Sequence, residues 1–553
     1  MSPNLKSNYF TRHPLAAVFL FVFICLFPAM LMRDFTPSNE LRYLSIADEA
    51  LSGRHFFAFF NHGVPYADKP PLYIWIVMLC KTIFGQHSVF ALSMFSLLPA
   101  FVVTWVMDKW VMEGAPTTDR MSMAMMMLSC AMFLGTSIVL RMDMLMCMFI
   151  VLSLFMFWRM YDLRLDGEPE GNDAVVYKKC SWYLPICIFM ALFTKGPVGL
   201  LVPPISIVVF LIAKRKWSDI GKYLGWKTWG VIFVLCIIWF ACVYADGGMT
   251  YLDNLLFKQT VGRAVNAFTH NKPIWYYAVA LLWCIAPYTL LLIGSIVSSA
   301  FAKNIRSDKE ILFLSVIAST FVMLSSFSSK LPVYLVPIFP FIVYLFPLVC
   351  SRTGARRWMA WAIGVPAAIL AIAGLVVAIV SGGYVNVSAI DSLRSEYPFI
   401  FTGPIRIAAI LLLVGNVLSL YFLLRRRQWN LPIFMIGSSM LLMIYSASGV
   451  LGKANAYIGY RDVCNEIPSE TDVATLFIYR PENMDVYIGR QVRDYKKDTE
   501  SFLKDAENAE RPFTLVTTAD KMESIPELHE FSHKARTIAY VGPYCVITVK
   551  PIK

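Results

Sequence analysis

The sequence predicts a polytopic α-helical membrane protein with a small α/β domain at its C-terminal end. Of its 553 residues, 58% are hydrophobic. Apolar runs of about 18 or more residues recur, and each is long enough to cross the hydrocarbon core of a bilayer. The region after residue 451 has a different composition, with short β-rich segments between polar ones. We therefore expect a transmembrane region at 1–451 and a separate domain at 452–553.

The charge pattern supports a membrane protein. The net charge of +12 indicates basic cytoplasmic loops rather than a nucleic-acid partner, because Lys and Arg collect on the inner side of membrane proteins. The basic N-terminal segment precedes an apolar run without a clear small-residue cleavage site, which predicts an uncleaved signal anchor. With the N-terminus inside, one side of the membrane receives all the basic clusters, at 214–216, 303–309, 352–357 and 425–427.

Hydropathy predicts about 13 spans. They cover 15–32, 88–106, 121–140, 144–158, the two halves of 182–212, 228–244, 274–296, 311–328, 331–348, 358–380, 405–424 and 431–450. The run 182–212 is too long for one helix, and Lys195, Gly196 and Pro197 form its breaking point. The apolar run 71–84 is about 14 residues long and contains Lys81, so we expect an interfacial or re-entrant helix there.

The tail has the pattern of a small α/β domain. Strands are predicted at 473–479, 513–519 and 537–550, the last with a Gly-Pro turn, and helices at 498–507 and 519–528. Pro526 weakens the second helix prediction. Cys464 and Cys545 lie in this tail and could form a disulfide in an oxidising compartment, but the sequence does not fix their distance. By parity of the spans, the domain lies outside.

Two long polar loops, 34–71 and 245–273, also lie outside. Loops of that length in compact domains are usually functional or disordered. The first contains many aromatic residues, which argue against disorder. We expect it to fold onto the membrane surface and to build an active site.

Isolated ionisable residues gather at this face: Glu40, Lys69, Arg141, Asp143, Lys195, His270 and Lys330. Such residues at membrane depth are functional by default, although any one of them could be a helix-end charge that reaches water. A carboxylate can deprotonate a nucleophile, and Lys and Arg suit a phosphate. The set predicts a site where a lipid-linked phosphate departs.

The sequence has no paired CxxC, no Walker A motif and no Rossmann glycine pattern. One HExxH pattern, His529-Glu530-Phe531-Ser532-His533, lies in the tail. We predict no firm cofactor and no metal ligands, while a divalent metal remains an open alternative.

The same residues carry a family resemblance. Six motifs, in order, resemble those of GT-C membrane glycosyltransferases in the protein-O-mannosyltransferase superfamily, most of all the branch with the bacterial lipid A aminoarabinose transferases. They are Pro37-Ser38-Asn39-Glu40-Leu41-Arg42-Tyr43, Asp68-Lys69-Pro70-Pro71, Arg141-Met142-Asp143, Thr194-Lys195-Gly196-Pro197, the run from His270 to Tyr277, and Lys330-Leu331-Pro332-Val333-Tyr334. The resemblance implies a GT-C fold and a periplasmic C-terminal domain.

The resemblance also implies roles for residues. Asp143, Glu40 and Asn39 occupy the catalytic positions, and the lipid phosphate and sugar would be bound by Lys69, Arg42, Tyr43, Arg141, Lys195, His270, Lys330 and Tyr334. One departure matters, because Asn39 stands where the family has an aspartate, and an amide is no general base at neutral pH. Either Glu40 or Asp143 takes that role, or Asn39 only orients the acceptor.

The expected function is transfer of a sugar from a polyprenyl-phosphate carrier to a lipid (lipid A-like) or protein acceptor. The expected location is the bacterial inner membrane, with membrane lipids around the chain and the site facing the periplasm. Two alternatives remain: a transporter of lipid-linked sugars, and a catalytically altered relative that binds them. A transporter usually places its polar site near the midplane, whereas these charges cluster at one face.

Overall fold

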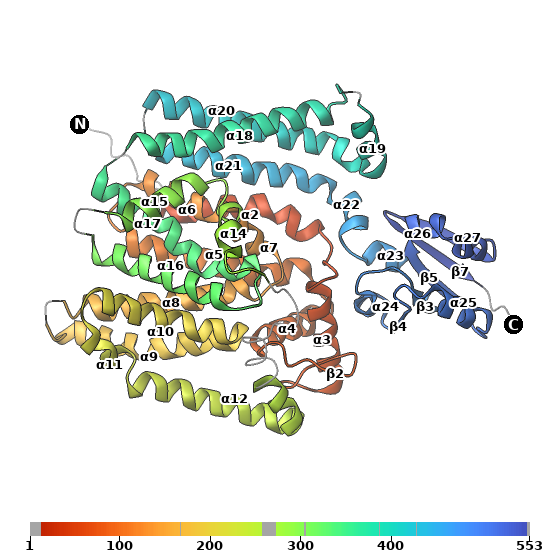
Figure 1. Ribbon diagram of the computed structural model, residues 1–553, viewed down its shortest axis with the longest axis horizontal. Coiled ribbons are helices and arrows are strands. Elements are labelled where there is room, and N and C mark those ends of the chain that lie inside the picture. The colour runs from red at the N-terminus through yellow and green to blue at the C-terminus, as the bar shows by residue number, and fades with distance from the viewer. Residues whose placement is uncertain are drawn as a thin grey trace, which may run out of the picture.

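The computed structural model describes residues 13–165, 167–256, 272–302, 306–354, 356–385, 387–426 and 428–549. Long helices lie side by side along one direction, and the sheet domain sits at one end of them (Figure 1). In the described part of the chain, ten helices are long and apolar enough to cross a membrane, or eleven if one bent pair counts as a span. The predicted polytopic fold is confirmed.

The helices of the membrane region follow the predicted order. They are α2 (Pro14–Met32), α5 (Val89–Val111), α6 (Thr117–Ser129), α7 (Ala131–Ile138), α8 (Asp143–Asp162), α9 (Gly171–Lys195), α10 (Pro197–Ala213), α12 (Trp226–Asp253), α14 (Tyr276–Cys284), α15 (Thr289–Ala300), α16 (Asp308–Ser326), η3 (Pro332–Ile338), α17 (Phe339–Thr353), α18 (Arg357–Ser381), α20 (Gly403–Arg426) and α21 (Asn430–Ala447). Short helices between them are η1 (Trp217–Asp219), α11 (Ile220–Tyr223), α19 (Ser388–Glu396) and η4 (Pro398–Phe401), and η5 (Ser448–Val450) follows α21.

The count of long spans is lower than the predicted 13 because three predicted spans are broken or short. The span predicted at 121–140 is the pair α6 and α7, bent by 71°. At that bend the amide of Ala131 donates to the carbonyl of Ala286 instead of to its own helix. The span predicted at 274–296 is divided into α14 and α15, and α10 has 17 residues. As predicted, the run before residue 85 forms a short helix, α4 (Leu72–Phe84).

Charged residues are found at both ends of the helical bundle. At the end away from the sheet domain, Lys214 and Tyr161 both bind Asp308, each at 2.6 Å. The first polar loop, 34–71, lies at the other end, beside the sheet domain, and 14 of its residues form a helix, α3 (Glu40–Gly53) (Figure 1). A two-residue hairpin, β1 (Phe60–Asn61) and β2 (Val64–Pro65), follows α3.

The C-terminal domain contains a five-stranded mixed sheet in the order β4-β3-β5-β7-β6. Its strands are β3 (Asp472–Thr475), β4 (Val492–Asp494), β5 (Phe513–Thr518), β6 (Ala535–Val541) and β7 (Tyr544–Val549). The smaller helices of this region are α22 (Leu451–Ile458), α23 (Arg461–Asn465), η6 (Pro481–Met484), α24 (Asp485–Ile488), α25 (Thr499–Glu507), α26 (Ala519–Ser524) and α27 (Pro526–Ser532). Sequence analysis missed β4, and Pro526 starts a new helix instead of weakening one.

Both faces of the central strands β5 and β7 are covered, whereas the edge strand β6 is largely exposed. On one face Leu515 packs with Phe502 and Phe531 of the domain's own helices. On the other face Val516 packs with residues of α3 and α4. Alternate side chains of a strand point to opposite faces, so the sheet lies between the helices of its own domain and the first polar loop.

This arrangement excludes the disulfide considered for the tail. Cys545 belongs to the apolar cluster on the helical side of the sheet, and Cys464 to the cluster on the loop side. Both thiols are free and buried. The sheet itself separates them.

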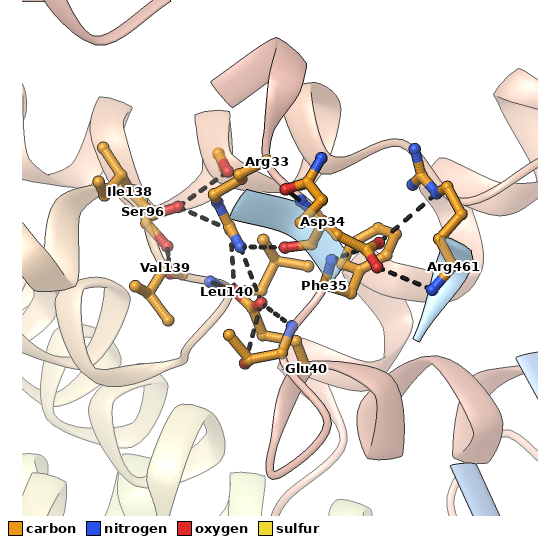
Figure 2. A network of polar contacts seen from close by, with 12 residues as sticks. Arg33, Asp34, Phe35, Glu40, Ser96, Ile138, Val139, Leu140 and Arg461 are labelled. Atoms are coloured by element: carbon orange, nitrogen blue, oxygen red, sulfur yellow. Dashed lines mark hydrogen bonds and ion pairs between the residues drawn. The ribbon is translucent and has the colours of Figure 1, made fainter. Parts of the chain in front are cut away.

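Asp34, directly after α2, joins the bundle to the C-terminal domain. Its carboxylate accepts hydrogen bonds from the amide of Arg461 at 3.0 Å and from the hydroxyl of Tyr487 at 2.5 Å. Its own amide donates to the side chain of Asn455 at 3.0 Å. Figure 2 shows Asp34 between the bundle and Arg461. A buried carboxylate needs such partners.

Substituting Gly459→Ala is expected to loosen this joint. A Cβ atom at residue 459 would lie 2.0 Å from a carboxylate oxygen of Asp34, so the two segments must separate. Overpacking of this kind costs about 1–3 kcal/mol, and a lower melting temperature of the purified protein is the measurement. Gly452→Ala is the matched control, because nothing lies within 4 Å of a Cβ atom there. Equal melting temperatures for both variants would contradict the tight joint.

Candidate active site

The scaffold of the site is a buried ion pair between Arg33 and Glu40. Both guanidinium nitrogens of Arg33 donate to the two carboxylate oxygens of Glu40, each at 2.8 Å. Glu40 is fully buried and also accepts from the amide and hydroxyl of Thr36 and from the amide of Leu140. Figure 2 shows these contacts meeting at one carboxylate. The carboxylate of Glu40 is therefore occupied by protein donors.

Asp143 lies at the centre of a second charged group. It is the first residue of α8 and is 1% exposed. Arg141 donates to one carboxylate oxygen at 2.9 Å, and the ammonium of Lys195 pairs with the other. The N-terminus of a helix also favours a negative charge. Asp143 is thus held ionised between two cations.

Three predicted motifs meet at this aspartate. Lys195 comes from the break between α9 and α10, as the sequence predicted. Its ammonium lies 4.3 Å from the centre of the Tyr334 ring, which belongs to η3. Burial is the largest single effect and would lower the pKa of Arg141, but the charge of Asp143 together with Tyr43 and Tyr334 raises it. Arg141 and Lys195 are the direct partners of Asp143, and an anion that binds here competes with Asp143 for them.

The first polar loop contributes the other half of the candidate site. Arg42 donates to the side-chain oxygen of Asn39 at 2.9 Å. Its guanidinium lies 5.5 Å from the Tyr66 ring centre and 5.8 Å from that of Tyr43. Burial raises the pKa of Tyr43, against the charges of Arg141 and Arg42. Tyr43 therefore lies between the two groups and joins them into one site.

The remaining predicted residues have different positions. Lys330 is buried and donates to the carbonyls of Lys272 and Phe327. Lys69 is half-buried in the turn before α4, next to Asp68, whose charge acts on Arg42. His270 lies outside the described residues.

Three structural carboxylates or cations escaped sequence analysis: Arg33, Asp34 and Asp246. Asp246 of α12 accepts hydrogen bonds from the amides of Phe56, Phe57 and Ala58, and it pairs with His55 at 2.9 Å. Asp246 thereby attaches the middle of the first polar loop, residues 55–58, to the end of α12. A signal was present for Arg33 and Asp34, which are two adjacent opposite charges directly after the first span.

The described residues include no group of three or more His, Cys, Asp or Glu side chains close enough to hold a metal ion. The cations already named can neutralise an anion, and the carboxylate of Asp143 can accept a proton. The arrangement is therefore able to support departure of a phosphate with attack by a hydroxyl group.

The ion pair between Arg33 and Glu40 predicts a specific pattern of stability. Substituting Arg33→Met leaves the Glu40 charge buried without its partner, which costs about 3–5 kcal/mol. Adding Glu40→Leu removes that charge, so the double variant should recover part of the loss. Denaturant or thermal unfolding measures both.

Arg511→Met is the control, since this arginine is exposed in the C-terminal domain. If the double variant were less stable than Arg33→Met alone, the mutual dependence of the pair would be refuted.

Comparison with known proteins finds transferases among the proteins to which the chain is similar. No family model matches the sequence. The chain is similar to the undecaprenyl phosphate-alpha-4-amino-4-deoxy-L-arabinose arabinosyl transferase of Enterobacter sp., at 23% identity over 305 residues, 54% of this chain and 53% of that protein. The chain thus spans about half the length of the curated relatives it matches.

Two solved structures share the architecture over more of the chain. ArnT from Cupriavidus metallidurans, bound to undecaprenyl phosphate, has a TM-score of 0.71 and 17% identity, covering 97% of both chains. The apo oligosaccharyltransferase of Archaeoglobus fulgidus has a TM-score of 0.53 and 11% identity, covering 93% of this chain and 70% of that one. The resemblance found in the motifs is confirmed, and the chain is a multi-pass membrane protein with the GT-C fold of these transferases.

Proposed function

We propose that the protein is a glycosyltransferase that moves a sugar from a polyprenyl-phosphate carrier to a lipid acceptor similar to lipid A. It would work in a bacterial inner membrane, with the site and the C-terminal domain facing the periplasm. The observation that carries the proposal is the buried carboxylate of Asp143 between Arg141 and Lys195, beside the ring of Tyr334. The Enterobacter relative is named for the same class of donor.

The chemistry follows from competition for the two cations. While Asp143 is paired with both, it is a poor proton acceptor. The phosphate of the donor attracts Arg141 and Lys195, so its binding releases an oxygen of Asp143. An acceptor hydroxyl then forms a bond to the anomeric carbon, the bond from that carbon to the phosphate oxygen breaks, and the hydroxyl proton passes to Asp143. Lys69 and Arg42 help to hold the departing phosphate.

Glu40 and Asn39 have supporting roles in this proposal. The carboxylate of Glu40 accepts from the protein donors Arg33, Thr36 and Leu140, so we assign it to holding the loop rather than to moving a proton. Asn39 accepts a hydrogen bond from Arg42, which fixes the guanidinium. An amide does this as an aspartate would, without the negative charge. The replacement at residue 39 is thus compatible with activity.

The cluster around Asp143 lies beside Tyr43 of α3, and α3 lies at the end of the bundle next to the C-terminal domain (Figure 1). This placement supports an enzyme over a transporter. The lipid acceptor and the polyprenyl carrier both lie in the membrane, so a site at its surface reaches both. The sugar itself, an aminoarabinose-like pentose, is suggested by the relatives' names alone.

The test is sugar transfer from a radiolabelled polyprenyl-phosphate sugar in membranes that contain each variant. Asp143→Asn is expected to lower transfer by about 100-fold or more, the usual contribution of a positioned base. Asn39→Asp is expected to keep activity equal to that of the wild type or greater.

Asp108→Asn serves as the matched control, because Asp108 is also buried and paired with an arginine, Arg120, but at the far end of the bundle. It should keep its activity per folded molecule. Full activity of Asp143→Asn would disprove the assignment of the base, and carrier binding without any transfer by the wild type would indicate a binding protein.

A further inference from the structure

A cavity of about 490 Å³ lies between the hairpin of the first loop and the C-terminal domain. The hairpin side contributes Asn61, His62 and Tyr66, and the domain side contributes Glu482 and Gln491. Its volume falls within the usual range of small-molecule sites, about 300–1,000 Å³. The proposed reaction at Asp143, Arg141 and Lys195 does not use this cavity.

The hairpin wall is held in place by α3. The tip residues His62 and Gly63 have positive φ angles of 54° and 76°, which suit a tight two-residue hairpin turn. The carboxylate of Glu49 accepts hydrogen bonds from both of their amides, at 2.7 and 2.9 Å. The turn is therefore fixed before any ligand arrives.

The domain wall is fastened to the same helix. The hydroxyl of Ser45 in α3 donates to the carboxylate of Asp485 at 2.8 Å, and the side chain of Asn483 donates to the carbonyl of Pro37 at 3.3 Å. Asp485 begins α24, directly after the segment that carries Glu482. Both walls thus share one support, so the cavity is a built feature of the interface.

The residues around the cavity differ in charge from the catalytic group. No Lys or Arg is among the described residues that line it, whereas a carboxylate, two amides, an imidazole and a phenol are. A phosphate would find no cation there and would be repelled by Glu482. Amides instead donate to and accept from neighbouring hydroxyls, a carboxylate accepts hydrogen bonds from them, and aromatic rings cover the apolar face of a sugar ring.

The cavity is separated from the catalytic group by one side chain. Tyr66 lines the cavity, and its ring faces the guanidinium of Arg42, which binds Asn39. The sugar of the donor is bonded to its phosphate and must lie with the cations. A group bound in the cavity lies on the far side of Tyr66 from those cations, against the C-terminal domain. We expect the part of an acceptor that is remote from its reacting group to extend there.

We propose that this cavity binds a neutral, hydroxyl-rich sugar unit of the acceptor and that Glu482 and Gln491 select it. This inference rests on the proposed function in naming the acceptor, but the binding itself can be measured without any transfer. The side chains concerned touch neither the phosphate nor the reacting atoms.

The first test measures binding of the neutral disaccharide N,N′-diacetylchitobiose to the purified full-length protein in detergent, without donor, by saturation-transfer NMR. Glu482→Ala and Gln491→Ala are expected to weaken binding about tenfold each, as loss of a hydrogen bond to a charged or paired group does. Glu527→Ala is the matched control, an exposed glutamate on α27 of the same domain. Melting temperatures exclude misfolding. Absence of binding, or equal binding in all variants, would overturn the inference.

The second test separates this inference from the proposed function. In the transfer assay the two cavity variants should raise the acceptor KM about tenfold and leave the donor KM unchanged. A rise in the donor KM instead would place the donor sugar in the cavity and overturn the inference. If the wild type transfers no sugar but binds the disaccharide, the proposed function fails and the sugar site stands.

Discussion

The ion pair between Arg33 and Glu40 joins the end of the first span and the start of α3 to a segment that lies 100 residues after Glu40 in the chain. Arg33 ends the first span, Glu40 begins α3, and the carbonyl of Ile138 and amide of Leu140 bind the same pair from the start of the α7–α8 connection. Because the pair is buried, each partner is needed by the other. Arg141 and Asp143 follow Leu140 directly, so the position of the proposed base depends on this contact. The loop, the bundle and the site share one electrostatic anchor.

Most of the membrane architecture was predictable because the bilayer imposes a length on apolar runs. The break at Lys195 was visible from Gly196 and Pro197, and the structure has it there. The bend between α6 and α7 was not visible, because it depends on a hydrogen bond from Ala131 to the distant Ala286. Sequence analysis has no access to a partner that only the fold brings near. The same holds for β4, a strand of three residues.

The sequence named residues that the structure brings together, but it did not show which contacts each of them makes. Asp143 and Lys195 come from separate motifs, and their pairing in the structure agrees with the expected convergence on one face. From the sequence, Glu40 looked like a carboxylate that was available for catalysis. In the structure it is paired with Arg33, and nothing in the sequence distinguishes Arg33 from an ordinary basic residue at the end of a span. Asp246 likewise looked like one charge in a long loop, although three consecutive backbone amides depend on it. Local sequence shows which groups are ionisable, and only packing shows which are already occupied.

The joint at Asp34 also has a consequence for biosynthesis. Its partners Asn455, Arg461 and Tyr487 lie 421, 427 and 453 residues further along the chain. During translation, the first polar loop is therefore synthesised long before the residues that bind Asp34 and hold the loop in place. The loop must wait through the insertion of every later span, with the Asp34 carboxylate still in water. Assembly of the site is thus coupled to completion of the nascent chain, so that a prematurely terminated product would not acquire the finished loop.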